Sequence, residues 1–212
     1  MNTLERKLPI GIQTFEDIRR GNYLYVDKTS ILWQIINTGK PYFLSRPRRF
    51  GKSLLISTLE AYFQGRKDLF EGLAIEKLEK KWEQYYGRNS YHVVWFASEG
   101  FNERTTKYEA ANLHQTHRIH AVRQIREAVY GDEKKDRSPE ERFSYVIEQA
   151  CLKTGKGVVV LVDEYDKPLL QALLDENLLD EYRRILKAFY GVLKSSDRYL
   201  RFIFLPGVTK FA

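Results

Sequence analysis

The sequence is poor in cysteine and has no long apolar run. Its single cysteine, Cys151, excludes an internal disulfide. No stretch reaches the roughly 18 consecutive apolar residues that a membrane helix needs. The N-terminal residues also lack the apolar segment that is typical of a signal peptide. These absences predict a cytoplasmic protein with no membrane partner.

Positive charge is what the sequence has in excess. Lysine and arginine number 35 against 28 acidic residues, a net charge of +7, and this favours anionic partners. Part of the excess is concentrated at Arg46, Arg48, Arg49 and Lys52, which indicates a bound phosphate group rather than a dedicated nucleic-acid surface. Because 43% of the 212 residues are hydrophobic, the chain can bury one sizeable core. Residues 1–212 are therefore predicted to form a single domain.

Residues 40–63 predict a strand, a tight basic loop and a helix. The apolar run Tyr42–Leu44 indicates the strand. Helical spacing follows at Leu54, Leu55, Thr58, Leu59, Tyr62 and Phe63. Gly51-Lys52-Ser53 lies at the junction, where the start of a helix offers unpaired backbone N–H groups and the positive end of its dipole. Both features favour a bound anion.

The side chains at this junction fit a magnesium–nucleotide complex. Lys52 is predicted to place its charge near the β and γ phosphates and to act in catalysis, and the Ser53 hydroxyl is predicted to bind Mg²⁺. The residues predicted to bind the nucleotide are Arg48, Arg49, Phe50, Gly51, Lys52, Ser53 and Leu54. The generic phosphate-loop pattern has a glycine where this sequence has Arg46, so a chance Gly-Lys-Ser tripeptide is the alternative interpretation.

A second segment, Gly157–Pro168, carries two adjacent carboxylates. The aliphatic run Val158–Val162 is short and mostly β-branched, which is typical of a strand buried on both faces of a parallel sheet. Asp163 and Glu164 follow at its carboxyl end. We expect Asp163 to hold Mg²⁺, directly or through water, and Glu164 to orient and deprotonate an attacking water. The alternative is a strand that simply ends in a polar turn.

Four blocks of the sequence resemble the AAA-ATPase-like family, whose P-loop domains are often joined to a C-terminal nuclease-like domain. They are Tyr25–Thr29, Leu44–Leu54, Asp163–Pro168 and Phe204–Phe211. The family's own loop reads Arg-Pro-Arg-Arg-Phe-Gly-Lys-Ser, so Arg46 fits the resemblance. The resemblance implies binding of ATP and its hydrolysis. The implied fold is an α/β, three-layer P-loop NTPase fold with a mostly parallel sheet and helices on both faces.

The same resemblance implies how the sheet ends. A strand at Tyr199–Leu205 is expected between the phosphate-loop strand and the strand that carries the acids. Thr209, just beyond it, is expected to sense the γ-phosphate or the attacking water in catalysis. The strand that normally covers the far edge is missing from the 212 residues. We therefore expect an exposed phosphate-loop strand and a chain that is the N-terminal part of a longer protein.

The remaining segments predict structure rather than chemistry. Alternation at residues 23–27 predicts a short strand, and Thr29 or Ser30 is expected to cap the helix that follows. Tyr25, Asp27 and Lys28 are open to contacts with a base or phosphate, but structural roles are favoured. Further predictions are a helical turn at residues 15–19, a strand at 91–97, a polar helix at 105–130 and a capping box at Ser138–Glu141. His114, His117 and His120 in the polar helix do not predict a metal site, because their spacing spreads them around it.

The sequence as a whole predicts a magnesium-dependent ATPase domain. One alternative is a nucleotide switch that holds ATP without useful hydrolysis and regulates a nuclease-like domain. The other is a nucleic-acid interaction module whose arginines grip a phosphate backbone. Nucleic acid is otherwise expected only through a fused or partner domain, and a homo-oligomer stays open.

Overall fold

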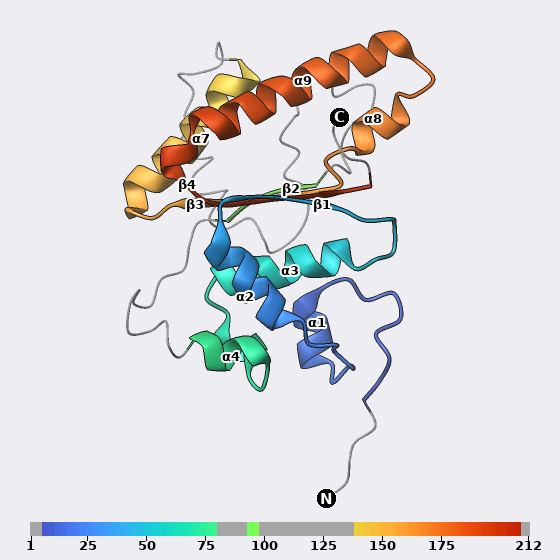
Figure 1. Cartoon of the computed structure of the whole chain (residues 1–212), viewed down its shortest axis with the longest axis vertical. Helices are drawn as coiled ribbons and strands as arrows, with labels where there is room; N and C mark the ends of the chain where they lie inside the picture. Colours follow the sequence, from blue (N-terminus) through green and yellow to red (C-terminus); the bar gives the residue numbers. More distant parts are fainter. Residues whose placement is uncertain (1–5, 80–92, 98–137, 209–212) are drawn as a thin grey trace, which may run out of the picture.

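Four parallel strands form one sheet at the centre of the computed structural model, which describes residues 6–79, 93–97 and 138–208. The strand order is β1-β4-β3-β2. The strands are β1 (Pro41–Ser45), β2 (Val93–Ala97), β3 (Val158–Asp163) and β4 (Leu200–Gly207). Helices lie on both faces of the sheet (Figure 1). The predicted α/β class, with a parallel sheet between two helical layers, is confirmed.

The N-terminal helices cover one face of the sheet and the C-terminal helices cover the other (Figure 1). The first face carries α1 (Phe15–Arg20), α2 (Thr29–Thr38), α3 (Lys52–Phe63), the 3-10 helix η1 (Lys67–Phe70) and α4 (Ala74–Glu79). The second carries α7 (Pro139–Thr154), α8 (Lys167–Gln171) and α9 (Glu176–Ser195). The 3-10 helix η3 (Asp197–Tyr199) leads from α9 into β4. None of the described helices combines the length and apolar character that crossing a membrane requires.

Strand β3 is buried on both faces, as its aliphatic run predicts. Val159 and Leu161 pack into the core below the sheet, whereas Val158 and Val160 pack into the core above it. Strand β4 alternates in the same way. A strand with two buried faces needs a helical layer on each side, and this fixes the position of the carboxyl end of β3.

Strand β1 lies at one edge of the sheet and, among the described residues, pairs only with β4. Its Phe43 side chain is 58% exposed. The expected order, with the Tyr199–Leu205 strand between the phosphate-loop strand and the acidic strand, is confirmed. The strand predicted at residues 91–97 is β2, on the opposite edge of the described sheet.

The strand predicted at residues 23–27 is wrong. The only pairing there is an isolated bridge between Lys7 and Tyr23. Within residues 6–79, 93–97 and 138–208 the alternation finds no partner strand, and the chain continues into α2 at Thr29. The capping prediction is also wrong, because neither Thr29 nor Ser30 caps α2 with its side chain. The Thr29 amide instead donates a hydrogen bond to the Asp27 carboxylate at 2.8 Å.

Asp27 has a structural role that the sequence already favoured. Its second carboxylate oxygen accepts a hydrogen bond from the Ala74 amide at 2.7 Å, so the side chain joins α2 to α4. The capping box at α7 is confirmed, with Ser138 and Glu141 exchanging side-chain-to-backbone hydrogen bonds. The polar helix predicted at residues 105–130, with its three histidines, lies outside the described residues.

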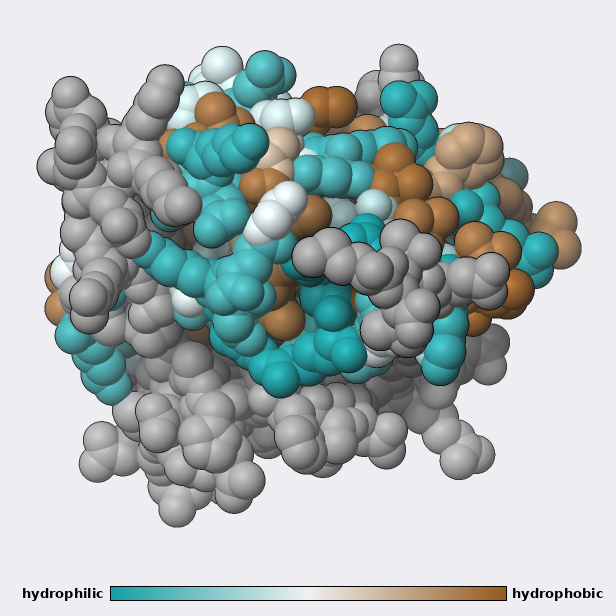
Figure 2. Space-filling model, turned by 90° about the horizontal axis from the view of Figure 1, so that it is seen from below, coloured by the Kyte–Doolittle hydropathy of each residue, from teal (hydrophilic) through white to brown (hydrophobic). Residues whose placement is uncertain are grey.

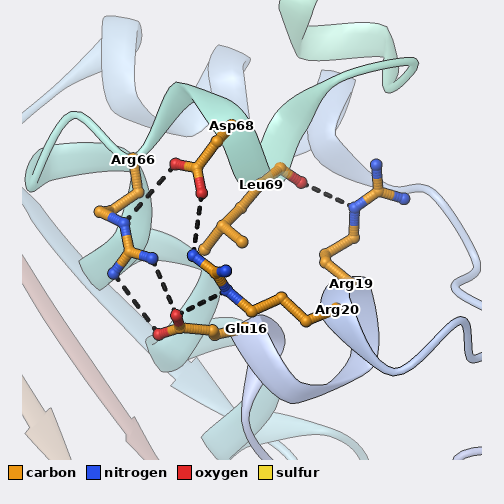
Figure 3. A network of polar contacts seen from close by, with 6 residues as sticks. All are labelled: Glu16, Arg19, Arg20, Arg66, Asp68 and Leu69. Carbon is orange, nitrogen blue, oxygen red and sulfur yellow. Dashed lines mark hydrogen bonds and ion pairs between the residues drawn. The ribbon is translucent and has the colours of Figure 1, made fainter.

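Ion pairs fasten α1 to the connection that follows α3 (Figure 3). Glu16 on α1 lies 2.8 Å from Arg66, whose hydrogen bond lowers the pKa of the glutamate, and Arg20 lies 3.2 Å from Asp68. Exposed pairs of this kind contribute little one by one. A buried hydrogen bond from the Phe15 amide to Ser57 Oγ, at 2.9 Å, adds a direct link to α3. These contacts hold the helix whose N-terminus receives the basic loop.

The surface on the side of α1 and α4 mixes hydrophilic and hydrophobic residues (Figure 2). Elsewhere in the N-terminal segment, several large apolar side chains of the described residues are exposed. They are Leu8, Ile10, Leu24, Val26 and Ile31.

Candidate functional site

The basic loop, residues 46–51, joins β1 to α3 and is exposed along its whole length. Two of its residues adopt left-handed backbone conformations, Arg49 with φ 65° and Gly51 with φ 75°. An added Cβ on Gly51 would meet nothing within 4 Å, so glycine is favoured there by the conformation and not by lack of space. A turn of this kind, leading into the N-terminus of a helix, makes a concavity lined by backbone N–H groups that suits an anion.

Lys52 holds the basic loop together from beneath. Its side chain is 6% exposed, and its ammonium donates hydrogen bonds to the carbonyls of Arg46 at 2.8 Å and Pro47 at 2.9 Å. A lysine ammonium has three donors, so one remains available beside the loop. The charge is therefore fixed at the first turn of α3, and the loop curves around it.

Asp163, at the carboxyl end of β3, lies next to this lysine although more than a hundred residues separate them in the chain. Burial raises the pKa of Asp163, and the charge of Glu164 raises it further. A hydrogen bond from the Ser53 side chain and the charge of Lys52 lower this pKa, but the net pKa is raised. Its Oδ1 atom is buried and has no hydrogen-bond partner among the residues that the structure describes. The structure thus brings Lys52, Ser53, Asp163 and Glu164 together.

Buried carboxylate oxygens usually have a hydrogen-bond donor, a water or an ion as a partner, so this atom is a candidate ligand for a water or an ion. Mg²⁺ prefers oxygen ligands and is usually bound through one or two protein groups, with phosphate oxygens and waters completing the octahedron. The Ser53 hydroxyl and the Asp163 carboxylate fit that donor set. The described part of the chain has no cluster of three or more His, Cys, Asp or Glu residues that could enclose a metal without such help.

Glu164 is in a strained backbone conformation with φ 48°, directly after the acid that ends β3. Its carboxylate forms an ion pair with Lys167 at 3.2 Å, with both side chains partly buried. The backbone amide of Lys167 also donates to the Glu164 carbonyl. Lys167 was not predicted as part of the site, because Glu164 lies in the turn before α8 and not on the helix.

The remaining predicted residues differ in their surroundings. Arg48, Arg49 and Phe50 are exposed, the last by 69%, and Leu54 is half-buried. Within the described residues neither arginine forms an ion pair, so both charges face solvent. Thr209 lies outside the described residues.

Asp166 is a second residue that the sequence analysis missed. It is buried at the end of β4, where its carboxylate accepts a hydrogen bond from the Val208 amide at 2.7 Å. Its position three residues after Asp163, in the turn that closes β3, was the only sequence signal.

Comparisons with known proteins identify the family of the chain. The family model described as "Predicted AAA-ATPase" matches residues 9–212. An "Uncharacterized protein in vnfD 5'region" of Azotobacter chroococcum mcd 1 is 43% identical over 208 residues, which make up 98% of this chain and 38% of that protein. The chain therefore spans little more than a third of this relative's length. No solved structure matches. On the extent of the family match, the chain belongs to the AAA-ATPase-like family of predicted AAA-ATPases.

Proposed function

We propose that the chain is a P-loop domain that binds ATP with Mg²⁺ and hydrolyses it. The observation that carries the proposal is the meeting of three side chains where β3 ends and α3 begins. Lys52 and Ser53 come from the start of α3 and Asp163 from the end of β3. Family membership supports the nucleotide, and the unpartnered Asp163 oxygen supports the metal.

Each residue then has a role that follows from its position. The backbone amides of the basic loop and the first turn of α3 hold the phosphates, with Arg48 and Arg49 adding positive charge. Lys52 neutralises charge that develops on the transferred phosphoryl group. Ser53 and Asp163 would hold Mg²⁺, which supplies charge neutralisation on the phosphates when bound. Asp163 must be ionised for this purpose.

Glu164 is the proposed residue that orients and deprotonates the attacking water. Its carboxylate forms an ion pair with Lys167 at 3.2 Å. For Glu164 to accept a proton from water, that contact has to loosen or turn when nucleotide binds. Thr209 is proposed to contact the γ-phosphate or the water from the far end of β4.

The Glu164–Lys167 ion pair also favours a second candidate, a nucleotide switch. If the pair persists with ATP bound, the protein holds ATP without useful turnover and acts as a regulator. Arg48 and Arg49, which are exposed and form no ion pair with any described residue, favour a third and weaker candidate, binding of a nucleic-acid backbone. That candidate requires binding that falls steeply with salt and is not displaced by ATP.

The test of the proposed function is calorimetric titration of the purified protein with ATP and GTP, with and without Mg²⁺, together with multiple-turnover phosphate release. We expect magnesium-dependent ATP binding and several turnovers per protein. Tight binding without turnover would identify the switch. No binding of either triphosphate, at any magnesium concentration, would contradict both.

Asp163→Asn is expected to remove the magnesium dependence of ATP binding while making the nucleotide-free protein more stable. Burial raises the pKa of Asp163, so at pH 7 the folded state holds a charge that the unfolded chain solvates better. A neutral amide of the same shape removes that cost. A gain of about 1 kcal/mol would raise Tm by about 2–4 °C in a domain of this size.

The pH dependence of this effect has a definite sign. Because the folded-state pKa is raised, wild-type stability improves as pH falls from that pKa toward the ordinary value of 3.8. The Tm advantage of Asp163→Asn therefore shrinks on acidification, which thermal denaturation between pH 7 and pH 4 would measure. Asp180→Asn, at an exposed aspartate of α9, removes a carboxylate outside the site and is the matched control. A Tm below wild type at pH 7 would contradict the prediction.

A further inference from the structure

The end of β4 is held from both sides by the two segments that form the site. On one side the Arg46 amide donates to the Gly207 carbonyl at 2.9 Å, and Ser45 Oγ donates to the Val208 carbonyl at 2.9 Å. On the other side the Val208 amide donates to Asp166 Oδ2 at 2.7 Å. The peptide unit that joins Gly207 to Val208 is thus tied on one side to the start of the basic loop and on the other to the turn after β3.

The Asp166 side chain accepts a hydrogen bond just beyond the point where the backbone pairing of β3 with β4 ends. The β3–β4 ladder ends at Leu161 and Phe204, whereas the β1–β4 ladder runs on to Ser45 and Gly207. Beyond Phe204, β4 therefore has a backbone partner on the β1 side only. Asp166 supplies the missing acceptor on the other side with a charge-assisted hydrogen bond, which is about twice as strong as a neutral one.

The turn after β3 packs against β4 with no space to spare. A Cβ added to Gly207 would lie 2.6 Å from Tyr165 Cε1 and 2.9 Å from Asp166 Cγ. Asp166 and Tyr165 are 1% and 4% exposed. A contact this close transmits a displacement of the turn to the strand end, because packed interiors yield little.

We propose that Asp166 is a positioning residue that sets the distance between the basic loop and the Asp163–Glu164 pair through the end of β4. The inference rests on the proposed function, because it assigns Asp166 a part in the same site. The effect of Asp166 passes through Val208 and Gly207 to Arg46, the first residue of the loop, while Asp163 lies three residues before it in the chain.

The kinetic test compares Asp166→Ala and Asp166→Asn with the control Asp180→Ala. Asp166→Ala is expected to lower kcat by about 10- to 100-fold, the size reported for small misplacements of reacting groups, with KM changed by less than about threefold. KM is spared because Lys52 still holds the loop through the carbonyls of Arg46 and Pro47, so the loop can bind ATP while its distance from Asp163 and Glu164 changes. Asp166→Asn should recover most of kcat, since its amide oxygen can still accept from Val208. Wild-type kcat in Asp166→Ala, or equal loss in both variants, would overturn the proposal.

A second measurement does not depend on ATP hydrolysis. Hydrogen–deuterium exchange of the nucleotide-free protein should rise in Asp166→Ala both at residues 200–208 and at residues 43–51, which include the basic loop. Ser45→Ala removes one tie on the loop side and should raise exchange in the same two segments to a smaller extent. Exchange that rises at 200–208 alone would overturn the proposal. If the wild-type protein shows no turnover, that result counts against the proposed function. The hydrogen–deuterium exchange measurement then still tests the role of Asp166.

Discussion

Lys52→Ala is expected to weaken ATP binding by about a thousandfold. A charge pair at about 4 Å in a partly wet site amounts to about 4 kcal/mol before desolvation, and each 1.4 kcal/mol corresponds to about tenfold in affinity. The lysine also donates to the carbonyls of Arg46 and Pro47. Its removal therefore takes away a charge at the phosphates and frees the loop that is curved around it.

Calorimetric titration with ATP and Mg²⁺ measures the loss. Lys187→Ala, at an exposed lysine of α9, changes the net charge by the same amount and should leave the dissociation constant unchanged. Lys52→Arg separates the effect of charge from that of geometry. A guanidinium keeps the positive charge, but its planar set of donors does not match the carbonyls of Arg46 and Pro47 as the ammonium does. We expect Lys52→Arg to bind ATP much more weakly than wild type. A dissociation constant of Lys52→Ala within a few-fold of wild type would remove this lysine from the site.

The elements that carry the site could be predicted from the sequence because each is encoded locally. Val158–Val162 is a run of aliphatic side chains that only a doubly covered strand can bury. Gly51 provides the left-handed residue that a sharp turn into α3 requires, with φ 75°. The convergence of Lys52 with Asp163 followed from placing both at the same edge of a parallel sheet. The order of the strands, in contrast, came from the resemblance and not from periodicity.

The polar contacts around those elements could not be predicted, for a physical reason. The partners of Glu164 and Asp166 depend on a left-handed turn at Glu164, φ 48°, which L-residues rarely adopt and which no periodic pattern encodes. The turn brings Lys167 to Glu164 and Asp166 to Val208. At residues 23–27 the local pattern was misleading, because the alternation fits a strand but no strand of the described sheet pairs with it.

Glu164→Gln is expected to stop turnover while sparing ATP binding. A general base contributes about 10²- to 10⁴-fold to rate, and a glutamine amide cannot accept the proton from water. The residue keeps its size, and the neighbouring Lys52, Ser53 and Asp163 are untouched. We therefore expect kcat to fall by about 10²- to 10⁴-fold with an ATP dissociation constant within about threefold of wild type. Multiple-turnover phosphate release and calorimetry on the same preparation measure both quantities, and Glu176→Gln, at an exposed glutamate of α9, is the control.

The combination of results separates the roles that Glu164 can have. Loss of turnover with retained binding identifies a base, because only the transition state needs a proton acceptor. Loss of both would mean that the Glu164–Lys167 ion pair holds the turn after β3 in shape, and the role of Glu164 would then be structural. Turnover of Glu164→Gln at the wild-type rate would mean that another group acts as the general base. A protein in which wild type and variant both bind ATP and neither releases phosphate would be the nucleotide switch, with Glu164 kept in its ion pair when ATP is bound.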